Sequence, residues 1–412
     1  MEKVILAGIY SDEKYKKDAQ YSLDELERLC NTDGAIAVDR VLQKRAAPDA
    51  ACFIGRGKAE EIKELVDKHN ADAVVFDDIL KPVQQKNLEE ITGAKVVDRV
   101  RVILDIFAIR ARTKEGKLQV ERAEWTYQLA HLANKGVHLD SQTGGIGTRR
   151  GPGEKKLETD KRKIRDKIAE LDREIEKIKE RREIQRGARA ASDLPEVAIA
   201  GYTNAGKSTL LKTLSKTNIY ADDKLFATLD PLTRKIRLPG GRFILLTDTV
   251  GFIKKLPHDL VDAFKSTMEE ILRAKCILHV VDASAPNAER NNHIETVLSV
   301  LNEIGAQNIP RITVFNKSDR LDKQEKAILN TPDACVISAS KGEGLEKLLS
   351  MIEKIVMPAH NSYKLRLQYS KQNLLGKIYK LANVKSEKWT KTSIVIELET
   401  SKDNWEQIEN LL

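Results

Sequence analysis

The chain has 412 residues, of which 41% are apolar and 32% charged, and its formal net charge is +8. This length predicts two to four domains, with buried cores beneath a heavily charged surface. No apolar run reaches ~18 residues and the apolar start MEKVILAGIY is too short for a signal peptide, so no membrane span is predicted and the cytoplasm is the expected compartment.

Four cysteines occur, and none of them forms a CxxC pair. Each lies in or beside an apolar run, which is typical of buried, reduced thiols rather than of metal or redox sites. The four are Cys30, Cys52, Cys276 and Cys335.

Residues 1–115 are expected to form an N-terminal α/β subdomain, because strand-like and helix-like runs alternate along them. This alternation favours a parallel sheet covered by helices. The strand-like runs are 4–10, 35–41, 72–78 and 94–100, and the helix-like runs between them are 22–30, 57–69 and 81–92.

Residues 116–190 are expected to form a helical-pair subdomain, with helices over 117–135 and 154–186. The second helix carries an apolar seam with alternating spacings of four and three, which needs a partner. The first helix is the nearest candidate, and the short connection predicts an antiparallel pair. The seam consists of Ile164, Ile168, Leu171, Ile175 and Ile178.

The tip of this predicted pair, residues 136–153, is rich in glycine and carries Arg149 and Arg150. It is either a hinge or a basic loop that enters a narrow anionic place such as folded RNA, where arginine pairs with phosphate. Most of the positive surplus lies in residues 149–190, where basic side chains outnumber acidic ones. That surplus indicates either a nucleic-acid partner or a solvated charged helix.

After a small, polar linker at 187–195, residues 191–358 alternate strand-like and helix-like runs again and are expected to form one domain with a mixed, mostly parallel sheet. The stretch EVAIAGYTNAGKSTLLKTL is a strand, a glycine loop and a helix start, and it fits the P-loop pattern from Gly201 to Ser208. Backbone N–H groups would surround the phosphates, Lys207 would reach the β- and γ-phosphates, and Ser208 would coordinate Mg²⁺.

The base of the bound nucleotide should be guanine, because NKSD at 316–319 follows the apolar strand RITVF, and residues 191–358 are thus expected to form a GTP-binding domain. Asp319 can accept from N1–H and from the exocyclic amine, a donor pair that adenine lacks. Asn316 and Lys317 would shape the base pocket. SAS at 338–340 follows another strand, and the Ala339 N–H is expected to meet the guanine carbonyl.

Two segments between these motifs are expected to sense the γ-phosphate. In FATLD at 226–230, Thr228 would complete the Mg²⁺ shell, with Thr233 as its competitor. In DTVG at 248–251, Asp248 would hold the metal through water and the Gly251 N–H would face the γ-phosphate. The next residue is Phe252, where many GTPases have a glutamine that orients the attacking water.

The last 54 residues, 359–412, are expected to form a small α+β domain without a chemical constellation. Runs 363–369 and 393–399 read as strands, and 373–382 and 403–412 read as helices.

In order, GYTNAGKS, FATLD, DTVG, NKSD and SAS, with TGGIGTRRGPGEKKLETDKRKI upstream, resemble the HflX family of ribosome-associated GTPases. The resemblance also covers FIGRGKAEEI and DRVRVILDIFAIRARTKEGKLQVE. It implies a P-loop GTPase with GTP and GDP as substrate and product, Mg²⁺ on Ser208 and Thr228, and catalytic roles for Lys207, Thr228 and Gly251. The implied nucleotide-binding positions are Gly201, Tyr202, Thr203, Asn204, Ala205, Gly206, Lys207, Ser208, Phe226, Ala227, Thr228, Leu229, Asp230, Asp248, Thr249, Val250, Gly251, Asn316, Lys317, Ser318, Asp319, Ser338, Ala339 and Ser340.

By the same resemblance, the chain would bind the 50S subunit and split or rescue stalled 70S ribosomes under stress. The N-terminal domain would dock on rRNA and the Arg149–Arg150 loop would point toward the peptidyl-transferase centre. A 50S-associated assembly or signalling GTPase, and an RNA-binding protein with nucleotide-tuned affinity, are the alternatives. The pattern usually has one arginine before GPGE, whereas two occur here, and the tail at 359–412 matches the family poorly. A monomer is expected, since pairing of the two long helices leaves no apolar stripe.

Overall fold

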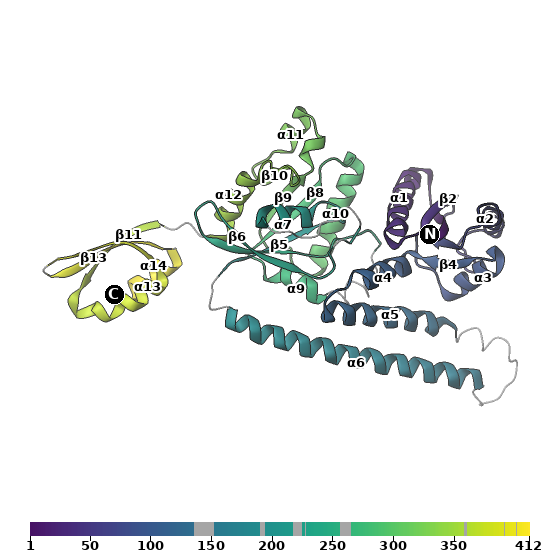
Figure 1. The fold of residues 1–412 in the computed structure, drawn as a ribbon, viewed down its shortest axis with the longest axis horizontal. Coiled ribbons are helices and arrows are strands. Elements are labelled where there is room, and N and C mark those ends of the chain that lie inside the picture. Colours follow the sequence, from purple (N-terminus) through teal and green to yellow (C-terminus); the bar gives the residue numbers. More distant parts are fainter. Residues whose placement is uncertain are drawn as a thin grey trace. The chain divides into compact units, whose positions relative to one another are not determined.

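The computed structural model describes residues 1–135, 152–189, 194–216, 225–226, 228–255, 265–357, 361–390, 392–400 and 402–412 (Figure 1). Most of the predicted tip loop, with Arg149 and Arg150, lies outside these residues, and so does Ala227. The chain divides into two compact units. The first comprises residues 1–236 and 245–345, and the second comprises residues 237–244 and 346–412.

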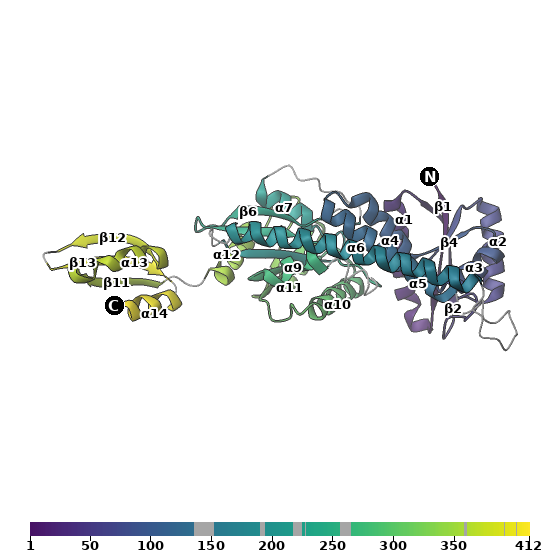
Figure 2. The ribbon, with the colours of Figure 1, turned by 90° about the horizontal axis from the view of Figure 1, so that it is seen from below.

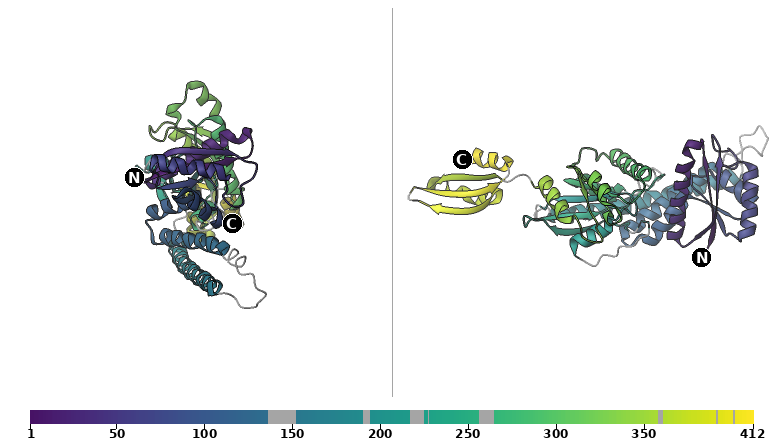
Figure 3. Two further views of the ribbon diagram at one scale, coloured as in Figure 1. Left: turned by 90° about the vertical axis from the view of Figure 1, so that its right-hand side faces the viewer. Right: turned by 90° about the horizontal axis from the view of Figure 1, so that it is seen from above.

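The N-terminal sheet has four parallel strands in the order β2-β1-β3-β4. Each strand falls on a run predicted from the sequence. Figure 3 (right) shows the sheet between its helices. The strands are β1 (Lys3–Tyr10), β2 (Ile36–Lys44), β3 (Ala73–Phe76) and β4 (Lys95–Asp98), and the helices are α1 (Lys16–Asp33), α2 (Arg56–His69), α3 (Pro82–Thr92) and α4 (Arg99–Arg110).

Alternate side chains of β1 enter two different cores, as the period of two in a strand requires. Val4 and Leu6 pack in a core with the α1 and α4 side chains, whereas Ile5 and Ala7 pack in a core with those of α2 and α3. The sheet is therefore the middle of three layers. Both of its faces are covered, which is typical of all-parallel sheets.

Two long helices follow, α5 (Lys114–Lys135) and α6 (Pro152–Arg189), and Figures 1 and 2 show them side by side. Ion pairs join them: Lys114 to Glu174, Glu121 to Lys167 and Arg122 to Asp172. The predicted seam faces this contact, since Ile164 and Leu171 are buried. Proline suits the first position of α6, because a helix needs no donor there.

The second sheet has six strands in the order β10-β9-β8-β5-β7-β6. The pairs β5–β7, β5–β8, β8–β9 and β9–β10 are parallel, as expected for a P-loop domain. The strands are β5 (Glu196–Gly201), β6 (Leu232–Arg237), β7 (Phe243–Asp248), β8 (Cys276–Asp282), β9 (Arg311–Asn316) and β10 (Ala334–Val336), and the helices are α7 (Lys207–Ser215), α9 (Lys265–Arg273), α10 (Asn287–Glu303) and α11 (Lys323–Leu329).

The second unit contains an antiparallel sheet in the order β11-β13-β12, whose apolar side chains form a separate core with two helices. It also includes α12 and the turn at 237–244. These two are joined by a hydrogen bond, in which the Gly240 N–H of the turn donates to the Glu353 carboxylate of α12 at 3.2 Å. The predicted tail boundary at 359 therefore lies within this unit. Its elements are β11 (Asn361–Gln368), β12 (Asn383–Trp389), β13 (Ser393–Thr400), α12 (Leu345–Val356), α13 (Leu375–Leu381) and α14 (Lys402–Leu411).

All four cysteines are buried, as predicted, and none of them forms a disulfide. Burial raises the pKa of Cys30 and of Cys276 to about 12. Within the described ranges, no helix combines the length and apolar character that a membrane crossing requires.

Candidate nucleotide-binding site

The P-loop connects β5 to the N-terminus of α7, and its shape depends on Gly206. This residue has φ +92°, and a Cβ there would lie 2.2 Å from the Asn316 side-chain nitrogen. Only glycine fits both conditions. The loop therefore lies close against Asn316, and the first residues of α7 line a cavity at the helix N-terminus, a position that favours an anion.

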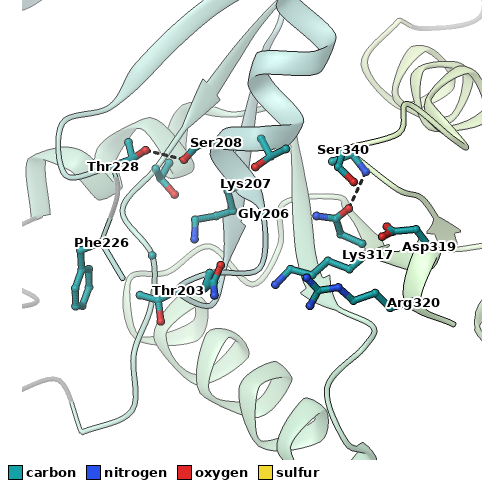
Figure 4. Close-up of a pocket in the computed structure, with 16 residues that line it drawn as sticks. Thr203, Gly206, Lys207, Ser208, Phe226, Thr228, Lys317, Asp319, Arg320 and Ser340 are labelled. Atoms are coloured by element: carbon teal, nitrogen blue, oxygen red, sulfur yellow. Dashed lines mark hydrogen bonds between the residues drawn. The ribbon is translucent and has the colours of Figure 1, made fainter. Parts of the chain in front are cut away.

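Lys207 is the first residue of α7, and its side chain is directed into the loop (Figure 4). Its ammonium donates to the carbonyl oxygens of Gly201 at 3.1 Å and Tyr202 at 2.8 Å. Burial lowers the pKa of Lys207 to about 8, and attraction to Asp248 opposes that shift. A phosphate is a stronger acceptor than these carbonyls, so it would stabilise the charged form.

Three oxygen-bearing side chains meet beside Lys207. The Ser208 hydroxyl donates to Asp248 Oδ2 at 2.7 Å and lies 2.7 Å from the Thr228 hydroxyl. Within the described residues, Asp248 Oδ1 is buried and has no hydrogen-bond partner. Hydroxyl and carboxylate oxygens are the ligands that Mg²⁺ prefers, with water and phosphate completing the shell. These residues therefore fit a magnesium ion.

Asp319 marks the other end of the cavity (Figure 4). Its carboxylate accepts from the Ser338 hydroxyl at 2.6 Å, and this hydrogen bond lowers the pKa of Asp319. The side chain is thus an ionised acceptor. Lys317, whose ammonium pairs with Asp282 at 2.7 Å, lines the same end.

Asn316 is buried and braces two loops. Its amide donates to the Ala205 carbonyl at 2.9 Å and accepts from the Ala339 N–H at 2.9 Å. The N–H that was expected to meet guanine is therefore already donated to a protein group. Asn316 holds the P-loop to the 338–340 loop.

These segments enclose a cavity of about 240 Å³. Thr209 and Arg320 also line it and were missed, although each directly follows a recognised motif. The predicted positions that line it are Thr203, Asn204, Gly206, Lys207, Ser208, Phe226, Thr228, Thr249, Gly251, Asn316, Lys317, Asp319, Ala339 and Ser340.

The remaining described positions do not line the cavity. Asp248 accepts a hydrogen bond from Ser208, and Ser338 donates one to Asp319, so each contacts a residue that lines the cavity. The Asp230 side chain is instead hydrogen-bonded at the start of α5. The competitor Thr233 bonds Thr247 instead, at 2.9 Å, so Thr228 is the threonine beside Ser208. The positions outside the lining are Gly201, Tyr202, Ala205, Leu229, Asp230, Asp248, Val250, Ser318 and Ser338.

Phe252 does not face the cavity. Its side chain is 2% exposed and packs in the core. Its backbone pairs with the P-loop, since its N–H donates to the Gly201 carbonyl and its carbonyl accepts from the Thr203 N–H. This residue therefore fixes the 248–252 segment against the P-loop and brings no polar group to an attacking water.

A buried charge network lies behind the P-loop. The Tyr202 hydroxyl donates to Glu25 at 2.5 Å, and Arg99, which is 1% exposed, pairs with Glu25 and with Asp77. Lys255, just after the 248–252 segment, pairs with Asp77 at 2.5 Å. The N-terminal subdomain thus contacts both the P-loop and the segment that should sense the γ-phosphate.

Replacing Asp319 with asparagine should lower the preference for GTP over ATP about 10- to 100-fold, because guanine loses an ionised acceptor worth roughly 1–3 kcal/mol. Competition between the two nucleotides for binding would measure this. Asp322→Asn, which changes only the cap of α11, is the matched control. Equal preference in wild type and Asp319→Asn would rule out the assignment of Asp319 to the base.

His279 in β8 should make stability depend on pH. Burial lowers its pKa from 6.5 to about 4, so the unfolded chain binds this proton at a higher pH than the folded chain does. The contribution of neutral His279 to the free energy of unfolding is complete above pH 6.5. As the pH falls from 6.5 to 4, this free energy should decrease by about 1.4 kcal/mol per pH unit. Denaturant unfolding between pH 7.5 and 4.5 would measure it. An equally steep dependence in His279→Gln would exclude this source.

Three family models match the chain in order. They are described as the N-terminal region of a GTP-binding GTPase over residues 20–108, its middle region over 110–189, and a 50S ribosome-binding GTPase over 196–317. The breaks between them fall just before α5 and in the linker before β5.

Curated relatives match over most of their length. A "GTPase HflX" of Lacrimispora saccharolytica is 50% identical over 86% of this chain and 83% of its own, and that of Escherichia coli K12 is 41% identical over 94% and 90%. A solved GTP-binding protein of Sulfolobus solfataricus in complex with GDP is 23% identical over 86% and 99%, with a TM-score of 0.44.

Proposed function

We propose, because the chain belongs to the HflX family of GTPases, that it binds the 50S ribosomal subunit and splits or rescues stalled 70S ribosomes under stress. The chain is a GTP hydrolase by that membership. The proposal includes that the protein is a cytoplasmic monomer. It also includes a division of the chain into four domains: the N-terminal α/β subdomain at 1–115, the helical pair at 116–190, the GTP-binding domain at 191–358 and the small α+β domain at 359–412.

One observation carries the dependence on the ribosome. The residues proposed to hold the phosphates, the metal and the base line one cavity, yet the residue after Gly251 is a phenylalanine with a buried side chain. Such a site can bind GTP and still hydrolyse it slowly, because the water has no glutamine to orient it. We infer that the ribosome completes the site, by adding groups or by ordering the segments around Thr228 and Gly251.

Each protein group has a stated task in this proposal. Lys207 and the P-loop N–H groups hold the β- and γ-phosphates, the Gly251 N–H faces the γ-phosphate, and Asp319 selects guanine. Ser208 and Thr228 would hold the metal, and Asp248, whose Oδ1 is buried without a partner among the described residues, would hold it through water. When bound, Mg²⁺ supplies positive charge that offsets the charge on the phosphate oxygens.

The helical pair supplies the contact with RNA in this proposal. Lys114 pairs with Glu174, and Glu121 pairs with Lys167, so the paired positions rise along α5 as they fall along α6. This order supports an antiparallel stalk, with residues 136–153 at its tip. Arg149 and Arg150 would then reach rRNA phosphates. The N-terminal subdomain would rest on the rRNA beside it.

Steady-state GTP hydrolysis by the purified protein, alone and with 50S subunits or 70S ribosomes, tests this proposal. We expect stimulation of at least about hundredfold, because completion of a site in trans can raise the rate by as much as roughly 10³–10⁵. Free protein that already turns over at the stimulated rate would refute the dependence on the ribosome.

Light scattering of 70S particles with GTP separates splitting from mere occupancy. A splitting factor lowers the signal, whereas an assembly or signalling GTPase leaves it unchanged. Thr228→Ala should retain GDP binding and lose both hydrolysis and splitting. If ribosome binding and output survive without nucleotide hydrolysis, the RNA-binding alternative is favoured instead.

A further inference from the structure

Asp230, in the segment that follows Thr228, holds the beginning of α5. Its Oδ2 accepts from the N–H groups of Arg112 and Thr113, each at 3.0 Å, and its Oδ1 accepts from the Thr113 hydroxyl. One carboxylate thus receives three donors from a segment more than a hundred residues earlier. These contacts lie within the first unit of the chain.

Thr113 is the residue that caps α5. Its hydroxyl accepts from the Gly116 N–H at 2.9 Å, and its carbonyl accepts from the Lys117 N–H at 3.0 Å, which is the first turn of the helix. A capping side chain of this kind satisfies one of the N–H groups that a helix start leaves unpaired. Asp230 fixes the capping residue and also places a negative charge at the positive end of the helix.

Gly116 provides a second, independent sign that this contact is specific. A Cβ on Gly116 would lie 2.4 Å from Asp230 Oδ1, so any other residue would push the carboxylate away. Glycine lowers helix propensity by about 1 kcal/mol relative to alanine, which makes it a poor choice in a first helical turn on local grounds. The close approach of Asp230 explains why it is there.

The same segment is held to the N-terminal subdomain on the other side of Thr228. Phe226 packs edge-to-face on Phe107 of α4, with ring centroids 4.6 Å apart. Thr228 therefore lies between two anchors, Phe226 and Asp230. Only one residue separates Thr228 from Asp230, and adjacent Cα atoms are 3.8 Å apart, so Thr228 cannot withdraw far from Ser208 without disturbing the cap.

We propose that Asp230 is a nucleotide-sensitive cap that couples the metal-binding Thr228 to the first turn of α5. The inference rests on the proposed role of Thr228. With GTP bound, Thr228 stays beside Ser208 and Asp230 holds the start of α5. When the γ-phosphate leaves, Thr228 withdraws and Asp230 releases Arg112 and Thr113. The first turn of α5 then loses the contacts that hold it in place.

The coupling is reciprocal, because a link between two sites changes the affinity at each by the same factor. Anything that fixes the helical pair and the start of α5 would favour the GTP-bound position of Thr228. Contact of the pair with a partner would thereby act on the nucleotide site through Asp230. Binding events at the helical pair would thus change the position of Thr228, which is proposed to hold the metal.

Hydrogen exchange on the full-length protein, without ribosomes, tests the cap. The amides to follow are those of Arg112, Thr113, Gly116 and Lys117, compared in Mg²⁺–GDP and in Mg²⁺ with a non-hydrolysable GTP analogue. We expect exchange about tenfold slower with the analogue, within the roughly 5–150-fold range of such couplings. Equal exchange in the two nucleotides would overturn the proposal.

Gly116→Ala is the sharpest variant, because it displaces Asp230 while favouring the helix. It should abolish the nucleotide dependence of exchange and lower kcat for GTP about tenfold while GDP affinity stays within twofold. Gly57→Ala, in the first turn of α2 where a Cβ meets nothing within 4 Å, is the control. If the two variants behave alike, Asp230 is not a coupling residue.

Asp230→Asn keeps the shape of the side chain and provides a second check. It should weaken the cap and raise the Mg²⁺ concentration needed for half-maximal hydrolysis, a change that a purely structural role would not produce. Since these measurements need no ribosome, their failure would leave the ribosome-stimulated hydrolysis proposed above intact. Failure of that stimulation would in turn leave the cap intact.

Discussion

Replacing Lys207 with alanine should lower kcat/KM for GTP hydrolysis about 100- to 1000-fold, the usual effect of removing a fixed donor from developing charge. Lys207 is the ammonium directed into the P-loop, where two backbone carbonyls hold it. Alanine cannot replace a charge-assisted contact with the phosphates. Initial-rate kinetics with Mg²⁺–GTP would measure the loss.

Removal of the Lys207 charge should raise the stability of the nucleotide-free protein or leave it nearly unchanged, although it lowers activity. Burial lowers the pKa of Lys207 to about 8, so without nucleotide its charge opposes folding. Lys207→Met, which retains the apolar stem, should therefore melt no lower than wild type while it loses activity. Lys212→Ala on the same helix is the matched control and should keep activity. A large fall in melting temperature for Lys207→Met would contradict this account.

Replacing Arg99 with methionine should destabilise the first unit by about 3–5 kcal/mol, because it leaves two carboxylates in the interior without their shared partner. Arg99 is 1% exposed, and the Asp77 side chain is 4% exposed. Asp77 keeps Lys255 and Glu25 keeps Tyr202, so the lower part of this range is expected. Thermal unfolding would show a fall of about 10 °C, at roughly 2–4 °C per kcal/mol.

Two further variants identify the cause of that loss. Arg101→Met, two residues along the same helix, removes an ion pair with Asp105 whose side chains are about one-third exposed, and should cost less than 1 kcal/mol. The triple variant Arg99→Met, Glu25→Gln, Asp77→Asn should recover part of the stability, because the unpaired charges are gone. No recovery would indicate that lost packing dominates.

The nucleotide site could be predicted because its motifs are local. Each of Lys207, Asp248 and Asn316 ends or follows one of the parallel strands β5, β7 and β9 of one sheet, and the carboxyl ends of parallel strands meet at one edge. The same reasoning correctly placed Thr228 beside Ser208. In the structure the Ala339 N–H donates to the buried Asn316 side chain, a contact between two loops that no local pattern specifies.

Features that depend on distant contacts were not predictable. Helix α4 was missed, because most of its side chains are buried and its apolar residues follow one another with little helical periodicity. Strand β12 was missed because polar residues occur on both of its faces. The Asp230 contact with Arg112 and Thr113 joins segments 117 or more residues apart, which no local pattern specifies.

The buried cysteines make the natural chain a convenient background for spectroscopic labelling. Their exposed fractions run from 0% to 8%, and burial raises the pKa of Cys30 and Cys276 to about 12 and also raises that of Cys52, so little thiolate is available to react with a maleimide at neutral pH. A single cysteine introduced at an exposed site such as Ile109 or Ile328, which are 66% and 76% exposed, would then be modified selectively. Dyes placed in this way would report motions of the chain without removal of any native thiol.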